Sequence, residues 1–302
     1  MAKMTGGQAF TESLKAQGVD TVFGIISVHT LDLYDSLFHQ QDYIRFIGGR
    51  VELGCGFMAD GYSRATGKPG VLLTSTGPGA ADSMGALGEA YFSSSAVLEI
   101  TTNVEQEFLN SGRLPTHETK DQLKMFESVT DWNASIGQVE SIPDHIVEAF
   151  QRFQTRRPRP IELEIPTDLL GAEADVEVLG PRDPEIPQGD SASVERTLEM
   201  LLNARRPVIV VGEEVQYHGG TEEIIQLAER LGAPVVTLDG AKGVFPENHP
   251  LSLGQAMGKR IWGENPVQEW LGTCDFALLL GSILPYRSTA GVGLKLPSNL
   301  AH

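Results

Sequence analysis

The feature that most limits how this chain can fold is a regular alternation of short apolar runs with helical segments. In the first half, each apolar run is followed by an amphipathic or small-residue helix. This alternation favours a parallel sheet covered by helices, the doubly wound α/β arrangement. The strands predicted in this half are Val19–Ile25, Tyr43–Ile47, Gly70–Ser75, Ala96–Thr101 and Ile161–Pro166.

The same alternation returns in the second half, which predicts two α/β domains with doubly wound parallel sheets. We assign residues 1–170 to the first domain and residues 193–302 to the second. Residues 171–192 are rich in acidic residues, Pro and Gly and have no helical or strand period, so we interpret them as a linker. Strands of the second domain are predicted at Pro207–Gly212, Pro234–Thr237 and Cys274–Gly281.

Composition and charge exclude several classes of protein. The chain has 302 residues, enough for two domains with cores of their own. No apolar run reaches the roughly 18 residues of a membrane span, and the first residues lack the apolar core of a signal peptide. The net charge of −17 argues against nucleic acid as a partner. The two cysteines lie in different predicted domains, so we expect no disulfide and a cytoplasmic protein.

One carboxylate, Glu52, stands at a special place in the first domain. It follows the predicted strand Tyr43–Ile47 and enters a helix that begins with small and apolar residues. Small residues let a backbone or a flat ring come close, and apolar neighbours favour the neutral acid over the carboxylate. These properties suit a group that gives or takes a proton near neutral pH. An acid in the first turn of a helix, favoured there by the helix dipole, is the alternative.

Two further turns are predicted at the same edge of the sheet. The turn Ile26–His29 follows the first strand, and the loop Thr76–Gly79 follows the strand Gly70–Ser75. Ligands of doubly wound sheets lie at the carboxyl ends of the strands. The strand order therefore brings Glu52 and both turns to one candidate site.

Two motifs in this half resemble the pyrimidine-binding domain of thiamine-diphosphate enzymes, in the acetolactate synthase and pyruvate oxidase branch. The first is Glu52-Leu53-Gly54 followed by Phe57-Met58-Ala59-Asp60-Gly61-Tyr62-Ser63-Arg64, and the second is Thr74-Ser75-Thr76-Gly77-Pro78-Gly79-Ala80. The resemblance implies that Glu52 hydrogen-bonds the aminopyrimidine ring of thiamine diphosphate and controls its protonation. It also implies a set of cofactor-binding positions, namely Ile26, Ser27, Glu52, Thr76, Gly77, Pro78, Gly79 and Asp82.

Two histidines are candidates for the substrate pocket, again by resemblance. His29 stands where acyloin-forming relatives such as benzaldehyde lyase carry a pocket histidine, and His117 belongs to a His-Glu pair on a long loop. A surface histidine and a helix cap are the respective alternatives. The sequence departs from the family pattern at Val51, Leu53 and Asp82, which leaves the substrate more open than the cofactor.

The second half resembles the central domain of the same family, through the loop Asp239–Pro250, and implies a six-stranded Rossmann-like sheet. Some relatives bind FAD there through an arginine; Ile283 stands at one such position, Arg287 is a second match, and we expect no flavin. The family's Gly-Asp-Gly…Asn-Asn motif, which holds Mg²⁺ and the diphosphate, does not occur in the sequence. We therefore predict that the chain is part of an enzyme, that the Mg²⁺ ligands lie in a further domain, and that the chain alone is inactive.

The predicted activity is thiamine-diphosphate- and magnesium-dependent carboligation or decarboxylation of 2-oxo acids, acetolactate-synthase-like. Lyase activity of the benzaldehyde lyase or 2-hydroxyacyl-CoA lyase kind is the alternative within the family, with aldehydes among the substrates. A non-catalytic subunit or a nucleotide-binding oxidoreductase is the alternative from another class. The helices after Glu52 and Gly79 are apolar over most of their circumference, so we predict a homodimer or a tetramer.

Overall fold

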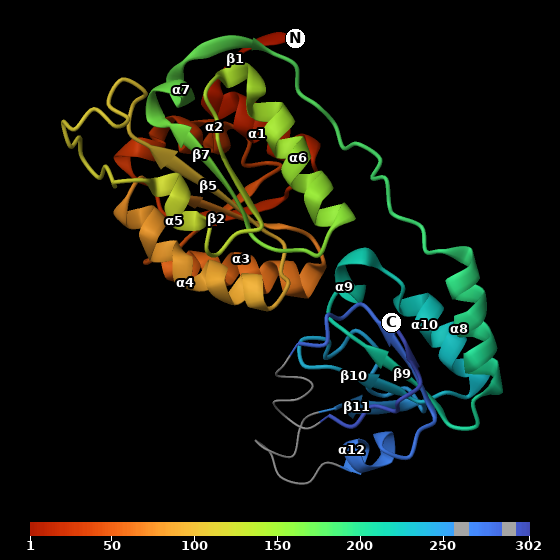
Figure 1. Cartoon of the computed structure of the whole chain (residues 1–302). Helices are drawn as coiled ribbons and strands as arrows, with labels where there is room; N and C mark the ends of the chain where they lie inside the picture. The colour runs from red at the N-terminus through yellow and green to blue at the C-terminus, as the bar shows by residue number, and fades with distance from the viewer. Residues whose placement is uncertain (257–265, 286–293) are drawn as a thin grey trace. The chain divides into compact units, whose positions relative to one another are not determined.

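The computed structural model describes residues 1–256, 266–285 and 294–302. The chain forms two compact units, Met1–Ile186 and Pro187–His302. Each unit has its own sheet and its own hydrophobic core (Figure 1). Both are α/β layers with parallel sheets, which confirms the predicted fold class.

A parallel six-stranded sheet forms the centre of the first unit. Its strand order is β3-β2-β4-β5-β7-β6, so the chain starts near one edge and winds in both directions. The central strands are buried over their whole length, as expected for a sheet covered on both faces. The strands are β2 (Thr21–Gly24), β3 (Arg45–Gly48), β4 (Gly70–Thr74), β5 (Val97–Asn103), β6 (Trp132–Ser135) and β7 (Ile161–Pro166).

Helices cover both faces of this sheet (Figure 1). One group packs around α1, and the other around the pair α3 and α4. The first group is α1 (Gly6–Ala16), α2 (Leu31–His39) and α6 (Ile142–Thr155), and the second is α3 (Glu52–Thr66), α4 (Pro78–Phe92) and α5 (Gln122–Phe126). Short 3₁₀ turns, η1 (Val28–Thr30) and η2 (Val139–Ser141), precede α2 and α6.

Several elements of the first unit were not predicted from the sequence. The short strand β1 (Ala2–Thr5) pairs antiparallel with β8 (Glu173–Val176), which follows α7 (Thr167–Gly171). The segment that we interpreted as a linker thus begins with a strand, because partners far apart in the sequence supply the hydrogen bonds. The β6 strand and helix α6 were not predicted either.

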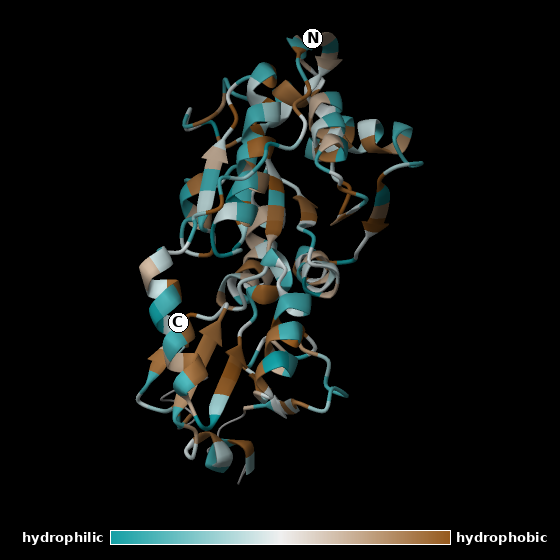
Figure 2. Ribbon diagram, turned by 90° about the vertical axis from the view of Figure 1, so that its right-hand side faces the viewer, coloured by the Kyte–Doolittle hydropathy of each residue, from teal (hydrophilic) through white to brown (hydrophobic). Residues whose placement is uncertain are grey.

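The second unit contains five strands among the described residues, where the resemblance implied six. Their order is β11-β10-β9-β12-β13, and all neighbours are parallel. Figure 2 shows strands of strongly hydrophobic character between helices with hydrophilic faces. The strands are β9 (Pro207–Val211), β10 (Val235–Thr237), β11 (Ser252–Gln255), β12 (Phe276–Leu280) and β13 (Leu300–Ala301), and the helices are α8 (Ser191–Asn203), α9 (Val215–His218), α10 (Thr221–Leu231) and α12 (Pro266–Leu271).

Two structural facts bear on the composition-based expectations. Both cysteines, Cys55 and Cys274, are free and buried, and they lie in different units. In the part of the chain that the structure describes, no helix has the length and apolar character to cross a membrane.

Candidate functional site

The turns predicted to form a site do meet at the carboxyl edge of the six-stranded sheet. Ser27, in the turn after β2, donates a hydrogen bond from its hydroxyl to the hydroxyl of Ser75, which follows β4, at 2.7 Å. Ser27 also receives support from Thr30, whose Oγ1 accepts from the Ser27 backbone N–H at 2.9 Å. These bonds fix the first turn against the start of the loop 76–79.

Glu52 lies against this loop as the first residue of α3, and its side chain is half-buried. A Cβ atom built on Gly79 would lie 3.1 Å from Glu52 Oε1 and 3.1 Å from Ser75 Cβ. The bare α-carbon of Gly79 therefore leaves the space in which the Glu52 carboxyl group sits. A side chain at position 79 would fill this space.

The rest of the loop is held by its own backbone conformation. Gly77 has a φ of +62°, and a Cβ there would collide with the carbonyl oxygen of His117. The N–H of Gly77 donates to Gln122 Oε1 at 2.7 Å, which ties the loop to α5. Pro78 begins α4, a position where its missing N–H and fixed φ cost nothing.

The two candidate histidines come together at this site. The rings of His29 and His117 lie 5.3 Å apart, centroid to centroid. Burial, and then the neighbouring His117, lower the pKa of His29, so the His29 ring is neutral near pH 7. Its Nδ1 atom is buried and has no hydrogen-bond partner among the described residues. His117 has a φ of +72°, a left-handed conformation that non-glycine residues rarely adopt.

Three of the predicted cofactor-binding residues differ in how far their side chains are buried. Ile26 is 54% exposed beside the turn. Thr76 is fully buried and its Oγ1 lies 3.0 Å from Thr102 Oγ1, so its side chain points into the sheet. Asp82 lies on the exposed side of α4.

A group of buried acids lies behind the site, and sequence reasoning missed it. Glu99 on β5 is fully buried and accepts a hydrogen bond from Thr74 Oγ1 at 2.7 Å. Its register partner on β7 is Glu162, also fully buried, followed by Glu164 two residues on. Burial raises the pKa of all three carboxyl groups, that of Glu99 to about 8. A signal was available, because acids inside otherwise apolar central strands are rare.

Gln122 connects these acids to the loop. It is buried, accepts from Gly77 and donates to the carbonyl oxygen of Thr102 at 2.8 Å. Its Nε2 also lies 3.2 Å from Glu164 Oε2. Loop, helix α5 and strands β5 and β7 thus share one hydrogen-bonded network.

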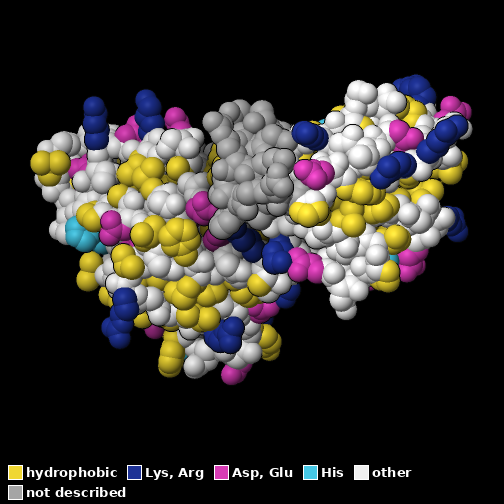
Figure 3. Space-filling view, turned by 90° about the horizontal axis from the view of Figure 1, so that it is seen from below, with side chains coloured by type: hydrophobic (Ala, Val, Ile, Leu, Met, Phe, Trp, Pro, Cys, Tyr) yellow, Lys and Arg dark blue, Asp and Glu magenta, His cyan; other side chains and the backbone are white. Residues whose placement is uncertain are grey.

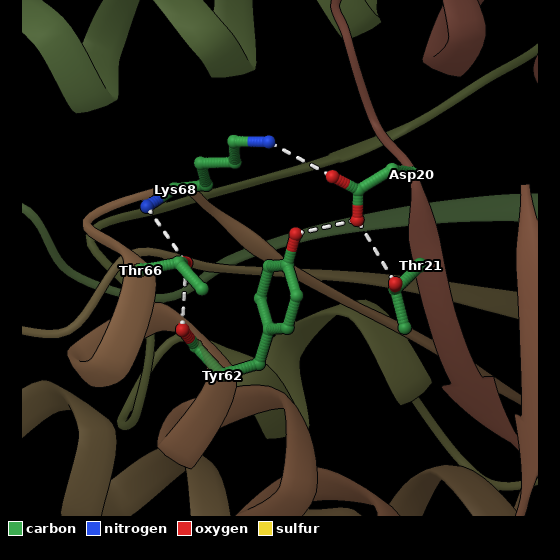
Figure 4. Close-up of polar contacts among 5 residues, drawn as sticks. All are labelled: Asp20, Thr21, Tyr62, Thr66 and Lys68. Carbon is green, nitrogen blue, oxygen red and sulfur yellow. Dashed lines mark hydrogen bonds and ion pairs between the residues drawn. The ribbon is translucent and has the colours of Figure 1, made fainter.

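Helix α3, which carries Glu52, is fixed at its other end by a polar cluster (Figure 4). The Tyr62 hydroxyl donates to Asp20 Oδ1 at 2.6 Å, and Lys68 Nζ lies 2.8 Å from Asp20 Oδ2. Asp20 immediately precedes β2, so the cluster joins the C-terminal half of α3 to the start of that strand. The ammonium of Lys68, together with the Tyr62 hydroxyl, lowers the pKa of Asp20 to about 2.

The carboxyl group of Glu52 and the loop 76–79 thus lie together at the carboxyl edge of a parallel sheet. Residues 4–126 match the family model described as thiamine pyrophosphate enzyme, N-terminal TPP binding domain, and residues 194–301 match the one described as its central domain. The chain therefore belongs to the family of thiamine-diphosphate-dependent enzymes, of which it carries these two domains.

Curated relatives agree with this assignment. A probable 2-ketoarginine decarboxylase of Pseudomonas aeruginosa is 37% identical over 281 residues, 92% of this chain and 49% of the relative. A probable acetolactate synthase large subunit of Methanocaldococcus jannaschii is 30% identical over 301 residues, 97% of this chain and 50% of the relative. A sulfoacetaldehyde acetyltransferase of Alcaligenes xylosoxydans is 32% identical over 280 residues, which are 93% of this chain and 45% of the relative. The chain spans about half the length of these relatives.

The family match supports a thiamine-diphosphate-dependent enzyme over a nucleotide-binding oxidoreductase. The predictions on flavin and metal stay open. Ile283 is 53% exposed after β12, whereas Arg287 lies outside the described residues. Among residues 1–256, 266–285 and 294–302, no group of three His, Cys, Asp or Glu side chains is arranged to hold a metal ion.

Proposed function

We propose that this chain supplies the pyrimidine-binding half of a thiamine-diphosphate- and magnesium-dependent enzyme that decarboxylates 2-oxo acids. The observation that carries the proposal is the Glu52 carboxyl group over the bare α-carbon of Gly79. A flat aminopyrimidine would fit beside this carboxyl group, which offers it a hydrogen bond.

When bound, the cofactor supplies the stabilised carbanion that 2-oxo acid decarboxylation needs. The residues of this chain would hold the ring and control its protons. Glu52 would donate a hydrogen bond to a ring nitrogen and exchange that proton. The backbone of Gly77 and Gly79 would line one side of the ring, with Ser27 supporting the loop through Ser75. Mg²⁺ and the diphosphate are expected to be held by residues outside this chain.

His29 and His117 are placed to act on the substrate. In the tautomer that carries its proton on the buried, unpartnered Nδ1, the neutral His29 ring is a donor that a substrate carbonyl or carboxylate group would satisfy. The pair lies at the same loop as Glu52, because His117 packs against Gly77. We assign these two residues to the substrate pocket.

Two outcomes of the reaction are compatible with this site. Transfer of the fragment that remains after decarboxylation to a second carbonyl compound would make the enzyme an acetolactate-synthase-like carboligase. Protonation of this fragment and its release as an aldehyde would instead make the enzyme a simple decarboxylase. The higher identity to the 2-ketoarginine decarboxylase, 37% against 30% for the acetolactate synthase, favours this second candidate. The lyase and non-catalytic alternatives have no comparable support.

The experiment is an assay of carbon dioxide release by the whole enzyme to which this chain contributes its two domains, with thiamine diphosphate, Mg²⁺ and a panel of 2-oxo acids. Analysis of products separates the aldehyde of a decarboxylase from the hydroxy-keto acid of a carboligase. Gly79→Ala should lower turnover, because its Cβ would lie 3.1 Å from Glu52 Oε1 and the carboxyl group would have to shift by a few tenths of an ångström. Gly61→Ala, on the same side of the sheet but with nothing within 4 Å, is the matched control and should stay active. Full activity of Gly79→Ala would contradict the proposal.

The assembly proposed for this enzyme is a homodimer, or a pair of such dimers, through α3 and α4. These helices expose apolar side chains, with Leu53 at 39%, Phe57 at 46% and Phe92 at 55% exposure. Figure 3 shows hydrophobic side chains gathered in patches between charged ones on the face that it draws. Sedimentation of the purified protein tests this proposal; a stable monomer at micromolar concentration would contradict it.

A further inference from the structure

The first unit contains a cavity of about 420 Å³ that the proposed reaction does not use. Its walls are helices α1, α2 and α7, together with the end of β1. The three helices contact one another and lie together in Figure 1. A volume of this size is ordinary for the binding site of a small molecule. Most of its polar lining comes from α1 and α2, namely Gln8, Glu12, Asp32, Asp35, Ser36 and His39.

Close backbone contacts hold the walls of the cavity in place. Helix α1 begins with Gly6 and Gly7. A Cβ atom on Gly6 would lie 2.1 Å from the carbonyl oxygen of Leu169 on α7, and one on Gly7 would lie 2.5 Å from that of Asp32 on α2. Helix α1 approaches both neighbours so closely because its first two residues have no side chain. The frame of the cavity is therefore set by the backbone.

The charge of the lining is negative. Three carboxyl groups line the cavity, those of Glu12, Asp32 and Asp35, and no lysine or arginine is among the described residues that line it. Glu12 is partly compensated from outside the cavity, because Gln40 Nε2 donates to its Oε1 at 2.6 Å and Lys15 Nζ lies 3.7 Å from its Oε2. The two aspartates on α2 have no such lysine.

The aspartates face the cavity with their charge largely free. Asp35 Oδ2 lies 3.8 Å from His39 Nε2, a contact that is an ion pair only when the histidine is protonated. The Asp32 carboxylate has neither an ion pair nor a hydrogen bond within the described part of the chain. A Cβ atom on Gly171 would lie 3.0 Å from Asp32 Oδ2, so this glycine leaves room for the carboxylate at the cavity wall.

A buried hydroxyl group at the same wall points independently to a ligand. Ser36 on α2 lines the cavity and is only 7% exposed, yet its hydroxyl makes no hydrogen bond to any described residue. A hydroxyl in a helix can bond to the carbonyl four residues back, as Thr11 Oγ1 does to Gly7 at 2.9 Å. Buried polar groups are normally paired, so the Ser36 hydroxyl needs a partner from inside the cavity. Ser36 also lies in the last turn of α2, where the helix dipole favours a cation.

The arrangement of the acids selects an organic cation over a metal ion. Among residues 1–256, 266–285 and 294–302, no three His, Cys, Asp or Glu side chains are placed to hold a metal ion. Asp32 and Asp35 are neighbours three residues apart on α2, whereas Glu12 comes from α1. An ammonium or guanidinium group has several N–H donors and can bond to more than one carboxylate and to a hydroxyl oxygen.

We propose that the cavity between α1, α2 and α7 binds a small organic cation that carries ammonium or guanidinium groups. One cationic group lies between Asp32 and Asp35 and donates to the Ser36 hydroxyl oxygen. A second cationic group, in a ligand that has one, reaches toward Glu12. This proposal does not depend on the proposed function, because none of these residues belongs to the site around Glu52.

Isothermal titration calorimetry of the whole enzyme that contains this chain tests the proposal with two probes, 1,4-diaminobutane and 4-guanidinobutylamine. The first carries only ammonium groups, and the second carries a guanidinium group, so the pair distinguishes the two cation types. Salt at about 0.15 M screens diffuse attraction to the net charge of −17. Measurement at about pH 8 keeps exposed histidines neutral. We expect saturable binding of at least one probe, at one site per chain, with a Kd below about 1 mM.

Two variants and a matched control locate the binding. Asp32→Asn should weaken it at least about fivefold and Ser36→Ala at least about twofold, since each removes an acceptor of the cation. Asp42→Asn is the control, because Asp42 is an exposed acid close in sequence that does not line the cavity, and it should leave the Kd unchanged. If Asp32→Asn fails to fold, the comparison of Ser36→Ala with Asp42→Asn decides.

Three results would overturn the proposal. One is the absence of saturable binding of both probes. Another is equal weakening by the cavity variants and by Asp42→Asn, which would mean that the probes respond only to the overall negative charge. The third is displacement of the probe by Mg²⁺ at equal concentration, which would mean that the cavity does not distinguish an organic cation from a metal ion.

Discussion

The two sheets of this protein share a parallel architecture but differ in what their central strands bury. In the second unit, β9 and β12 bury aliphatic and aromatic side chains such as Ile209, Val211 and Phe276. In the first unit, β5 and β7 bury Glu99 and Glu162 together with hydroxyl groups at the same depth. The difference teaches that a parallel sheet of this kind needs no polar interior to fold, so the fold by itself does not require the buried acids.

The position of these acids connects them with the candidate site. Burial of a carboxyl group without a cation costs free energy, and a hydrophobic side chain of similar size would remove that cost. The acids lie on the strands whose carboxyl ends adjoin the loop at Gly77, and Gln122 links that loop to Glu164. The first unit therefore combines a scaffold with a polar network behind its site, whereas the second unit has an apolar core.

The largest expected effect tests whether the chemistry belongs to the first unit. Glu52→Gln should lower the turnover of 2-oxo acid by about 100-fold to 10,000-fold, the usual contribution of a general acid or base. Its fold should be unchanged, because the amide has the same shape. Glu222→Gln, an acid in the first turn of α10 in the second unit, is the control and should retain activity. Steady-state kinetics with circular dichroism as the folding check measures both.

A core substitution tests the apolar character of the second sheet. Ile209 is fully buried on β9, within the cluster that includes Val235 and Phe245. Ile209→Ala should destabilise this unit by about 2–5 kcal/mol, through lost burial and the cavity that remains. Chemical denaturation followed separately for each unit should show the loss of stability in the transition of the second unit alone. A loss of less than about 1 kcal/mol would mean that this core is loosely packed.

The pH dependence of stability tests the polar character of the first sheet. The folded-state pKa of Glu99 is raised to about 8 from its ordinary value of 4.5. A raised acid stabilises the folded state fully below its unfolded pKa, and this stability is lost as pH rises through the folded value. The first unit should therefore lose stability between about pH 4.5 and about pH 8, by up to about 1.4 kcal/mol per pH unit where Glu99 titrates.

Denaturation midpoints measured over this pH range check the slope. Glu99→Gln should flatten it, since the amide does not titrate. An equal slope in wild type and variant would show that Glu99 is not the group responsible. The second unit has no comparable acid on its described strands and should show little change over the same range.

The smallest expected effect concerns the cluster around Asp20. Tyr62→Phe removes the hydroxyl that donates to Asp20 and should cost about 0.5–1.5 kcal/mol, as a single hydrogen bond does. The lowered pKa of Asp20 means that the cluster stabilises the protein above the unfolded pKa near 4 and that this contribution is lost as pH falls toward about 2. Thermal denaturation at neutral and acidic pH measures this, and a Tyr62→Phe effect that persists unchanged in acid would contradict the role of the carboxylate.

Much of the fold and part of the site could be predicted from the sequence alone. The alternation of apolar runs with helices determined the two parallel sheets, because period and length are local properties of the chain. The rule that ligands lie at the carboxyl ends of strands brought Glu52, the turn at Ser27 and the loop at Gly79 together, and the structure places them side by side. The glycine at position 79 was informative about the site, because only a residue without a side chain leaves space for the Glu52 carboxyl group there.

Other features depend on partners that are distant in the sequence, and only the tertiary structure decided them. Strand β8 exists because β1, about 170 residues earlier, supplies its hydrogen bonds, as pairing requires a partner in space rather than a local period. The Thr76 side chain is buried against Thr102 and that of Asp82 is exposed, since the direction of a side chain follows from the backbone of the loop and helix that carry it. The pairing of Glu99 with Glu162 follows from the register of two strands joined by a long crossover, so no pattern within either strand could reveal it.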